Sequence, residues 1–130
     1  MVKGMNELMI QTETTLRFAF GTNWNKFLSD LNGERIRIAE RSLQEIVGVQ
    51  DLHDKAFLDV GCGSGLISLA ARRLGARVYS FDRDTQSIGC AHRLKGQYYP
   101  LDTKWNIAAG SVLDTEFLRS LGTFDVVYSW

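Results

Sequence analysis

The segment FLDVGCGSG, residues 57–65, constrains the fold of this 130-residue chain more than any other stretch. A short apolar run leads into three glycines at alternate positions, Gly61, Gly63 and Gly65. Glycine costs backbone entropy wherever regular structure holds it, so this density indicates a turn that side chains would block or a ligand that approaches the backbone closely. We therefore predict a buried strand, then a tight turn, then a ligand site.

The segments around this turn alternate between predicted strands and helices. Strands are expected at residues 56–60, 76–82, 105–111 and 124–130. Helices are expected at residues 34–47, 66–75, 85–99 and 114–122. This alternation predicts an α/β fold, a Rossmann-like parallel sheet with helices on both faces. Ligands of such sheets bind beyond the carboxyl ends of the strands, which is where the glycine turn falls.

Composition and charge narrow the class of protein. Fifteen basic and fifteen acidic residues cancel, so we expect no nucleic-acid partner and no membrane partner. Cys62 and Cys90 have neither the number of a disulfide framework nor the spacing of a zinc site, and we expect reduced thiols and no metal. The N-terminus lacks the apolar run of a signal peptide, which favours a cytoplasmic protein.

Two aspartates suggest what the ligand carries. Asp59, two residues before Gly61, is a poor neighbour for a pyrophosphate and a good one for an ammonium group. The spacing G-x-G-x-G also differs from the G-x-G-x-x-G of dinucleotide sites. Asp82 ends the second predicted strand, where a carboxylate can accept both hydroxyls of an adenosine ribose. NAD would use Asp82 in the same way, so this residue does not choose between the cofactors.

Four motifs in order, FLDVGCGSG, VYSFDRD, GSVLD and FDVVYSW, resemble those of class I S-adenosylmethionine-dependent methyltransferases across residues 56–130. The helix ERIRIAERSL also resembles the upstream helix of small-molecule members of that superfamily. The resemblance implies S-adenosyl-L-methionine as cofactor, S-adenosyl-L-homocysteine as product, and a small-molecule methyl acceptor. We expect two regions, an N-terminal segment at 1–33 that could form a covering helix, and the cofactor-binding half of a methyltransferase domain at 34–130.

The resemblance assigns roles to matching positions. Asp59 should hold the methionine ammonium, directly or through water, and Asp82 the ribose hydroxyls. The loop backbone should lie near the methionine and the ribose; its residues are Gly61, Cys62, Gly63 and Gly65. The remaining cofactor contacts are Arg83 beside the adenine, Ser111 and Val112 at the adenine edge, and Ser129 and Trp130 between the methionine and the acceptor. Related proteins often have aspartate in place of Ser111. The sequence indicates no general base.

Each assignment has a simpler alternative. Asp59 could satisfy loop N–H groups, Gly65 could serve packing alone, and Asp82 could cap a helix. A non-catalytic module that binds adenosylmethionine, or an NAD-binding domain, stays open as an alternative function. Because domains of this resemblance carry three more strands, we expect a domain truncated after the fourth strand. An uncovered fourth strand would favour self-association through its edge.

Overall fold

The structure of the chain, a computed structural model, describes residues 24–129. The predicted N-terminal segment, residues 1–33, is therefore described only from residue 24 onward. Trp130, one of the predicted cofactor contacts, lies outside the described residues.

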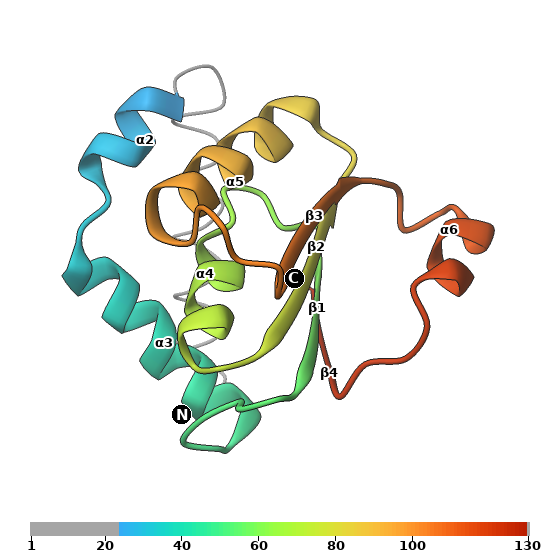
Figure 1. Cartoon of the computed structure of the whole chain (residues 1–130), viewed down its shortest axis with the longest axis horizontal. Helices are drawn as coiled ribbons and strands as arrows, with labels where there is room; N and C mark the ends of the chain where they lie inside the picture. The colour runs from blue at the N-terminus through green and yellow to red at the C-terminus, as the bar shows by residue number, and fades with distance from the viewer. Residues whose placement is uncertain (1–23, 130) are drawn as a thin grey trace.

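A four-stranded parallel sheet forms the centre of the fold (Figure 1). Its strands are β1 (Ala56–Val60), β2 (Arg77–Asp82), β3 (Trp105–Ala109) and β4 (Val126–Ser129). The helices are α2 (Trp24–Asp30), α3 (Gly33–Val47), α4 (Leu66–Arg73), α5 (Thr85–Tyr98) and α6 (Thr115–Ser120). The strand order β3-β2-β1-β4 reverses direction at β1, because the chain first builds outward to β3 and then returns to the other side of β1. The predicted Rossmann-like parallel sheet is confirmed.

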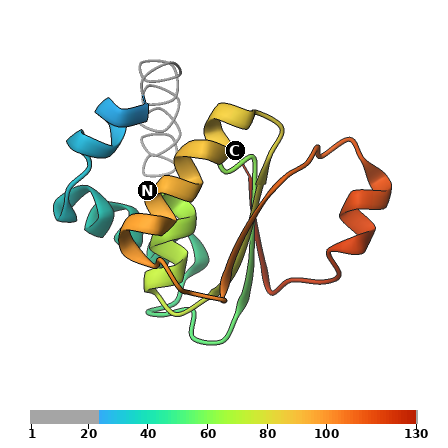
Figure 2. The ribbon, with the colours of Figure 1, turned by 45° about the horizontal axis from the view of Figure 1, so that its top comes forward.

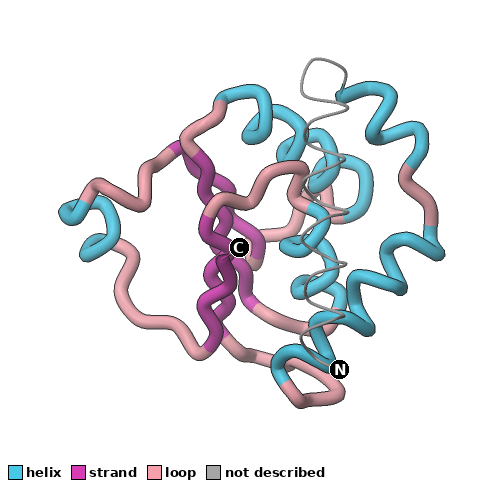
Figure 3. The backbone as a smooth tube through the Cα atoms, turned by 180° about the vertical axis from the view of Figure 1, so that it is seen from behind, coloured by secondary structure: helices cyan, strands magenta, loops and turns pink. Residues whose placement is uncertain are grey.

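The helices cover the two faces of the sheet unequally. Helices α4 and α5 pack on one face, and α3 packs on the outer side of α4 (Figures 1 and 2). Seen from behind, α6 is the one helix of residues 24–129 that lies on the opposite side of the sheet (Figure 3). No residue of α6 is buried, and its Phe117 ring meets the Phe81 ring edge-on at 5.0 Å between centroids. One face therefore carries most of the core described here.

Polar caps set where the helices begin. The Asn32 side chain accepts a hydrogen bond from the backbone N–H of Arg35, so α3 begins at Gly33. The Asp84 and Asp114 side chains cap α5 and α6 in the same way. Gly48 ends α3 in the left-handed conformation that glycine adopts without steric cost.

The core lies between the sheet and α3, α4 and α5. Phe57, Val78 and Trp105 are neighbours across β1, β2 and β3 in register, and each is at most 2% exposed. The Tyr128 ring of β4 stacks on Phe57 with centroids 6.3 Å apart. Period-two alternation thus sends these side chains to the helix-covered face, together with every second residue that follows them along each strand.

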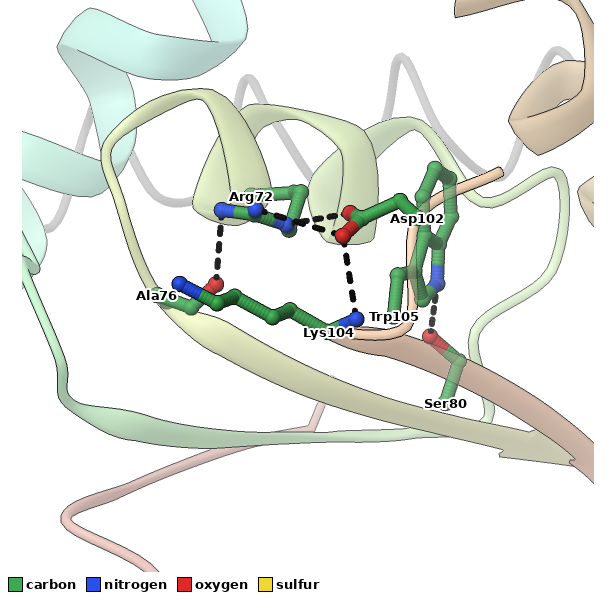
Figure 4. A network of polar contacts seen from close by, with 6 residues as sticks. All are labelled: Arg72, Ala76, Ser80, Asp102, Lys104 and Trp105. Carbon is green, nitrogen blue, oxygen red and sulfur yellow. Dashed lines mark hydrogen bonds and ion pairs between the residues drawn. The ribbon is translucent and has the colours of Figure 1, made fainter. Parts of the chain in front are cut away.

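An ion pair anchors the segment that leads into β3. Arg72 of α4 donates to Asp102 through Nε at 2.5 Å, and its Nη1 donates to the carbonyl of Ala76 at 3.3 Å (Figure 4). Burial alone would raise the pKa of the Asp102 carboxyl, but the hydrogen bonds from Arg72 and from the backbone N–H of Lys104, with the charges of Arg72 and Lys95, hold that pKa below its usual value. Both partners are mostly shielded, with side chains 15% and 12% exposed.

We expect Asp102→Asn to lower the free energy of unfolding by about 1–3 kcal/mol at neutral pH, because a charge-assisted pair is lost. Folding lowers the pKa of the Asp102 carboxyl. The greater stability of wild type is therefore fully present above the unfolded-state pKa of about 3.9, and it disappears as the pH falls through the folded-state pKa. Denaturant unfolding at a series of pH values measures this. Asp30→Asn, an exposed position at the end of α2, is the control; an Asp102 difference that persists at the lowest pH would contradict the account.

Candidate functional site

The glycine loop between β1 and α4 has a left-handed backbone at every glycine. The φ angles are +71° at Gly61, +56° at Gly63 and +90° at Gly65. A side chain at such an angle costs roughly 1–2 kcal/mol, which explains why the sequence has glycine at each of these positions. The loop then delivers the chain into α4, whose N-cap is Gly65.

Backbone hydrogen bonds hold the loop against β2. The N–H groups of Gly61 and Cys62 both donate to the carbonyl of Phe81, at 2.9 and 3.0 Å. Within the loop, the N–H of Gly65 donates to the carbonyl of Cys62 at 2.9 Å. The loop is therefore tied to the strand that carries Asp82.

The space around Gly61 differs from the space around Gly65. A Cβ added at Gly65 would come within 3.1 Å of the Ala91 Cβ and 3.2 Å of the Ala91 Cα on α5. A Cβ added at Gly61 would meet no atom of residues 24–129 within 4 Å. Gly65 is thus required by the close packing of α4 on α5 as well as by its φ, as its simpler interpretation holds. The backbone of Gly61 faces open space, which suits the approach of a ligand.

Asp82 joins the end of β2 to the glycine loop. Its carboxylate, 7% exposed, accepts from the N–H of Gly63 through Oδ2 and from the N–H of Asp84 through Oδ1, both at 2.9 Å. The residue that caps α5 is Asp84, whose side chain accepts from the N–H of Gln86 and from the Ser87 hydroxyl. A helix cap therefore does not account for Asp82. Ribose hydroxyls would share its oxygens with backbone donors, since each carboxylate oxygen accepts more than one hydrogen bond.

Asp59 lies inside the core and not in the open part of the site. It is 1% exposed and accepts a hydrogen bond from the Ser68 hydroxyl of α4 at 2.6 Å. Its strand neighbour on β2 is Ser80, which points to the same face of the sheet. The carboxylate is thus enclosed by β1, β2 and α4 directly before the glycine loop.

The remaining predicted residues that the structure describes lie along the same edge of the sheet. The register pairs Asp82 with Ala109, so Ser111 and Val112 follow close to the end of β2; it also pairs Val60 with Ser129. The Ser111 hydroxyl accepts from the N–H of Leu113 at 3.1 Å, and Val112 is 58% exposed. Arg83 and Ser129 are exposed, whereas Cys62 is buried.

Residues that the sequence analysis did not identify contact Asp82 and Asp59 near the same edge of the sheet. Gly110 donates its N–H to the carbonyl of Asp82 at 3.1 Å, and the Phe117 ring occupies the space that a Cβ at Gly110 would need. Ser68, Ser80 and Trp105 form a buried polar chain that ends on Asp59. The glycine after the third strand was a usable signal for Gly110, but no short motif marks the serines, which come from separate elements.

Within residues 24–129, no cluster of three histidine, cysteine or acidic side chains could hold a metal ion. No helix in that range is long and apolar enough to cross a membrane.

Comparison with known proteins gives the family signal. A family model described as "Ribosomal protein L11 methyltransferase (PrmA)" matches residues 39–97, which contain α4, β1, β2 and most of α3 and α5. A ribosomal protein L11 methyltransferase from Helicobacter hepaticus is 36% identical over 72 residues, covering 55% of this chain and 22% of that protein. The protein of the same name from Psychrobacter sp. is 55% identical over 82 residues, covering 55% and 26%. The matched region is therefore about a quarter of the length of these relatives.

Solved structures share the fold. Magnesium protoporphyrin IX methyltransferase from Synechocystis, determined with bound SAH, superposes with a TM-score of 0.56 at 22% identity, covering 88% of this chain and 56% of that one. The C-terminal domain of precorrin-6Y C5,15-methyltransferase from Rhodobacter capsulatus superposes with a TM-score of 0.57 at 18% identity, covering 71% and 48%. At this identity the likeness concerns the fold alone.

The predicted resemblance to class I S-adenosylmethionine-dependent methyltransferases is confirmed: part of the chain matches a methyltransferase family model, its relatives by sequence are methyltransferases, and its fold is shared with solved methyltransferases. The predicted small-molecule acceptor is wrong: the relatives found by sequence are named for a protein acceptor, ribosomal protein L11. That prediction depended on the helix at 34–47. In the structure this helix is α3, and its buried residues pack it against α4, so its amphipathic pattern reports core packing and carries no information on the acceptor.

The two glycines predict different costs of substitution. Gly61→Ala should lower the free energy of unfolding by about 1–2 kcal/mol through its φ angle alone. Gly65→Ala adds overpacking against Ala91 and should cost about 2–4 kcal/mol. Denaturant unfolding of the two variants checks this, and equal costs would mean that contact with α5 does not select glycine at position 65.

Proposed function

We propose that the protein to which this chain belongs transfers a methyl group from S-adenosylmethionine, with the cofactor bound along the carboxyl edge of the sheet. The observation that carries this is the convergence of three features near one edge of the sheet: the open space at the Cβ position of Gly61, the Asp82 carboxylate at the end of β2, and the buried Asp59 carboxylate one residue before the end of β1. The reversal of strand order at β1 falls at the same edge. The resemblance to S-adenosylmethionine-dependent methyltransferases supplies the identity of the cofactor.

The site offers a distinct environment to each part of the cofactor. Asp82 lies where the ribose hydroxyls would be accepted, and it already fixes the loop through Gly63. Asp59 supplies negative charge behind the loop for the methionine ammonium, directly or through water. The exposed residues that follow β2 and β3, Arg83 and Val112, would border the adenine.

The chemistry requires positioning more than acid–base groups from this chain. When bound, the cofactor supplies an electrophilic methyl group on a sulfonium. The residues described here would bind and orient it, and alignment with the acceptor nucleophile can provide much of the acceleration. Ser129, at the end of β4, is exposed at the edge where the acceptor would approach. The names of the relatives make a protein, ribosomal protein L11, the acceptor to test first.

Calorimetric titration tests the cofactor. We expect the protein to bind S-adenosylhomocysteine and S-adenosylmethionine and not NAD, because Asp59 and the loop spacing suit an ammonium rather than a pyrophosphate. Radiolabelled methyl transfer to ribosomal protein L11 then separates an enzyme from a binding module. Binding of NAD without any response to S-adenosylhomocysteine would overturn the proposal.

Asp82→Ala is the matched variant for the ribose half of the site. Loss of charge-assisted hydrogen bonds should weaken S-adenosylhomocysteine binding about tenfold or more. Because Asp82 also holds Gly63, its loss could weaken binding through the loop alone, and the 2′-deoxy analogue of S-adenosylhomocysteine separates the two effects. Wild type should bind this analogue less well than S-adenosylhomocysteine, and the variant should no longer distinguish the two ligands. A folded variant that still distinguishes them would remove Asp82 from the ribose contacts.

A further inference from the structure

A chain of buried hydrogen bonds crosses the core and ends on Asp59. The indole Nε1 of Trp105 donates to the Ser80 hydroxyl at 3.0 Å (Figure 4). The Ser80 and Ser68 hydroxyls are 2.5 Å apart, and Ser68 donates to Oδ2 of Asp59 at 2.6 Å. The chain therefore links β3, β2, α4 and β1 in that order.

The chemistry of the groups gives these hydrogen bonds one direction. The indole N–H is only a donor, and an ionised carboxylate is only an acceptor. The single proton of Ser68 is used on Asp59, so Ser80 must donate to Ser68 and accept from Trp105. Each donor in the series therefore points toward Asp59, and hydrogen bonds aligned in this way strengthen one another in a low-dielectric core.

These hydrogen bonds lie inside the apolar core, and a contribution to stability alone is a weak explanation for their presence there. Trp105, Ser80 and Ser68 are each 0% exposed, surrounded by the apolar core. Replacing all partners of a buried hydrogen bond by apolar groups of the same shape is often close to neutral for stability. An apolar core that replaced Asp59 as well would need none of these donors, so they are required only because the buried Asp59 carboxylate is present.

The Trp105 end of this series of hydrogen bonds is itself held in place. Asp102, held by Arg72, accepts from the N–H of Lys104, the residue before Trp105 (Figure 4). The entry into β3 is thereby anchored to α4, the same helix that carries Ser68. Helix α4 therefore fixes both ends of this series of hydrogen bonds: it carries Ser68, and through Arg72 and Asp102 it holds the backbone beside Trp105.

We propose that Ser68, Ser80 and Trp105 are positioning residues that fix the Asp59 carboxylate for recognition of the cofactor's ammonium group, an inference that rests on the proposed function. None of the three touches the cofactor in this account; they act through Asp59. A ligand that lacks the ammonium should therefore be indifferent to them.

The test compares S-adenosylhomocysteine with its desamino analogue, in which hydrogen replaces the amine, by calorimetric titration. Wild type should prefer S-adenosylhomocysteine, and Ser68→Ala should reduce that preference about tenfold, the lower end of the loss seen when an outer partner of a metal ligand is removed. Affinity for the desamino analogue should stay at the wild-type value. Trp105→Phe, which removes only the indole donor, should shift the preference in the same direction by less.

Ser42→Ala is the control, because Ser42 is a serine only 2% exposed that lies on α3, away from this chain. It should leave the preference unchanged. If Ser68→Ala fails to fold, the preference in Trp105→Phe decides. The positioning role would be overturned by folded variants that keep the wild-type preference, or by variants that lose the same affinity for S-adenosylhomocysteine and for its desamino analogue. In either case, binding of S-adenosylhomocysteine by wild type would leave the proposed function intact. A wild-type protein that binds neither ligand would overturn both proposals.

Discussion

The passage from β1 into α4 requires a left-handed backbone at Gly61, Gly63 and Gly65, and the rest of the site depends on that turn. Because the turn has no side chains at these positions, its N–H groups reach the Phe81 carbonyl and the Asp82 carboxylate on the neighbouring strand. The same turn starts α4 close enough to α5 for Gly65 to meet Ala91. The strand end, the loop and the start of the helix thus form one unit, with open space among the described residues at the Cβ position of Gly61.

Two buried carboxylates at this edge are held by donors of the fold itself. Burying a charged group is costly unless it is hydrogen-bonded, and Asp82 and Asp59 meet that condition in different ways. Asp82 uses backbone N–H groups of the loop and of the β2–α5 turn, whereas Asp59 uses the hydroxyl of Ser68. The interactions that make these charges tolerable also fix their orientation, which is what recognition of an ammonium and a ribose requires.

Much of this arrangement could be predicted from local sequence, because the determining interactions are local. The apolar run before the glycines places β1 correctly at residues 56–60, and capping residues bring the predicted helices within one or two residues of those observed. Register then carries the predicted site residues to one edge, since parallel strands end together. The roles assigned to those residues stay predictions.

What could not be predicted depends on contacts between distant elements. The hydrogen bond from Gly63 to Asp82 and the chain from Trp105 to Asp59 join residues whose neighbours in sequence give no sign of it. The burial of Asp59 was missed for the same reason. The acceptor was predicted wrongly because an amphipathic helix, α3, was interpreted as a mark of substrate class when its pattern serves packing.

The central claim is that S-adenosylhomocysteine lies against the glycine loop at the carboxyl edge of the sheet. Amide chemical-shift perturbation by NMR, with S-adenosylhomocysteine added to the protein, tests it most directly. The account predicts that the largest shifts fall on Gly61, Gly63, Asp84 and Val112, with little change on the outer helix α3. Shifts concentrated on α3 or α6, or saturating binding that leaves the glycine amides unmoved, would contradict it.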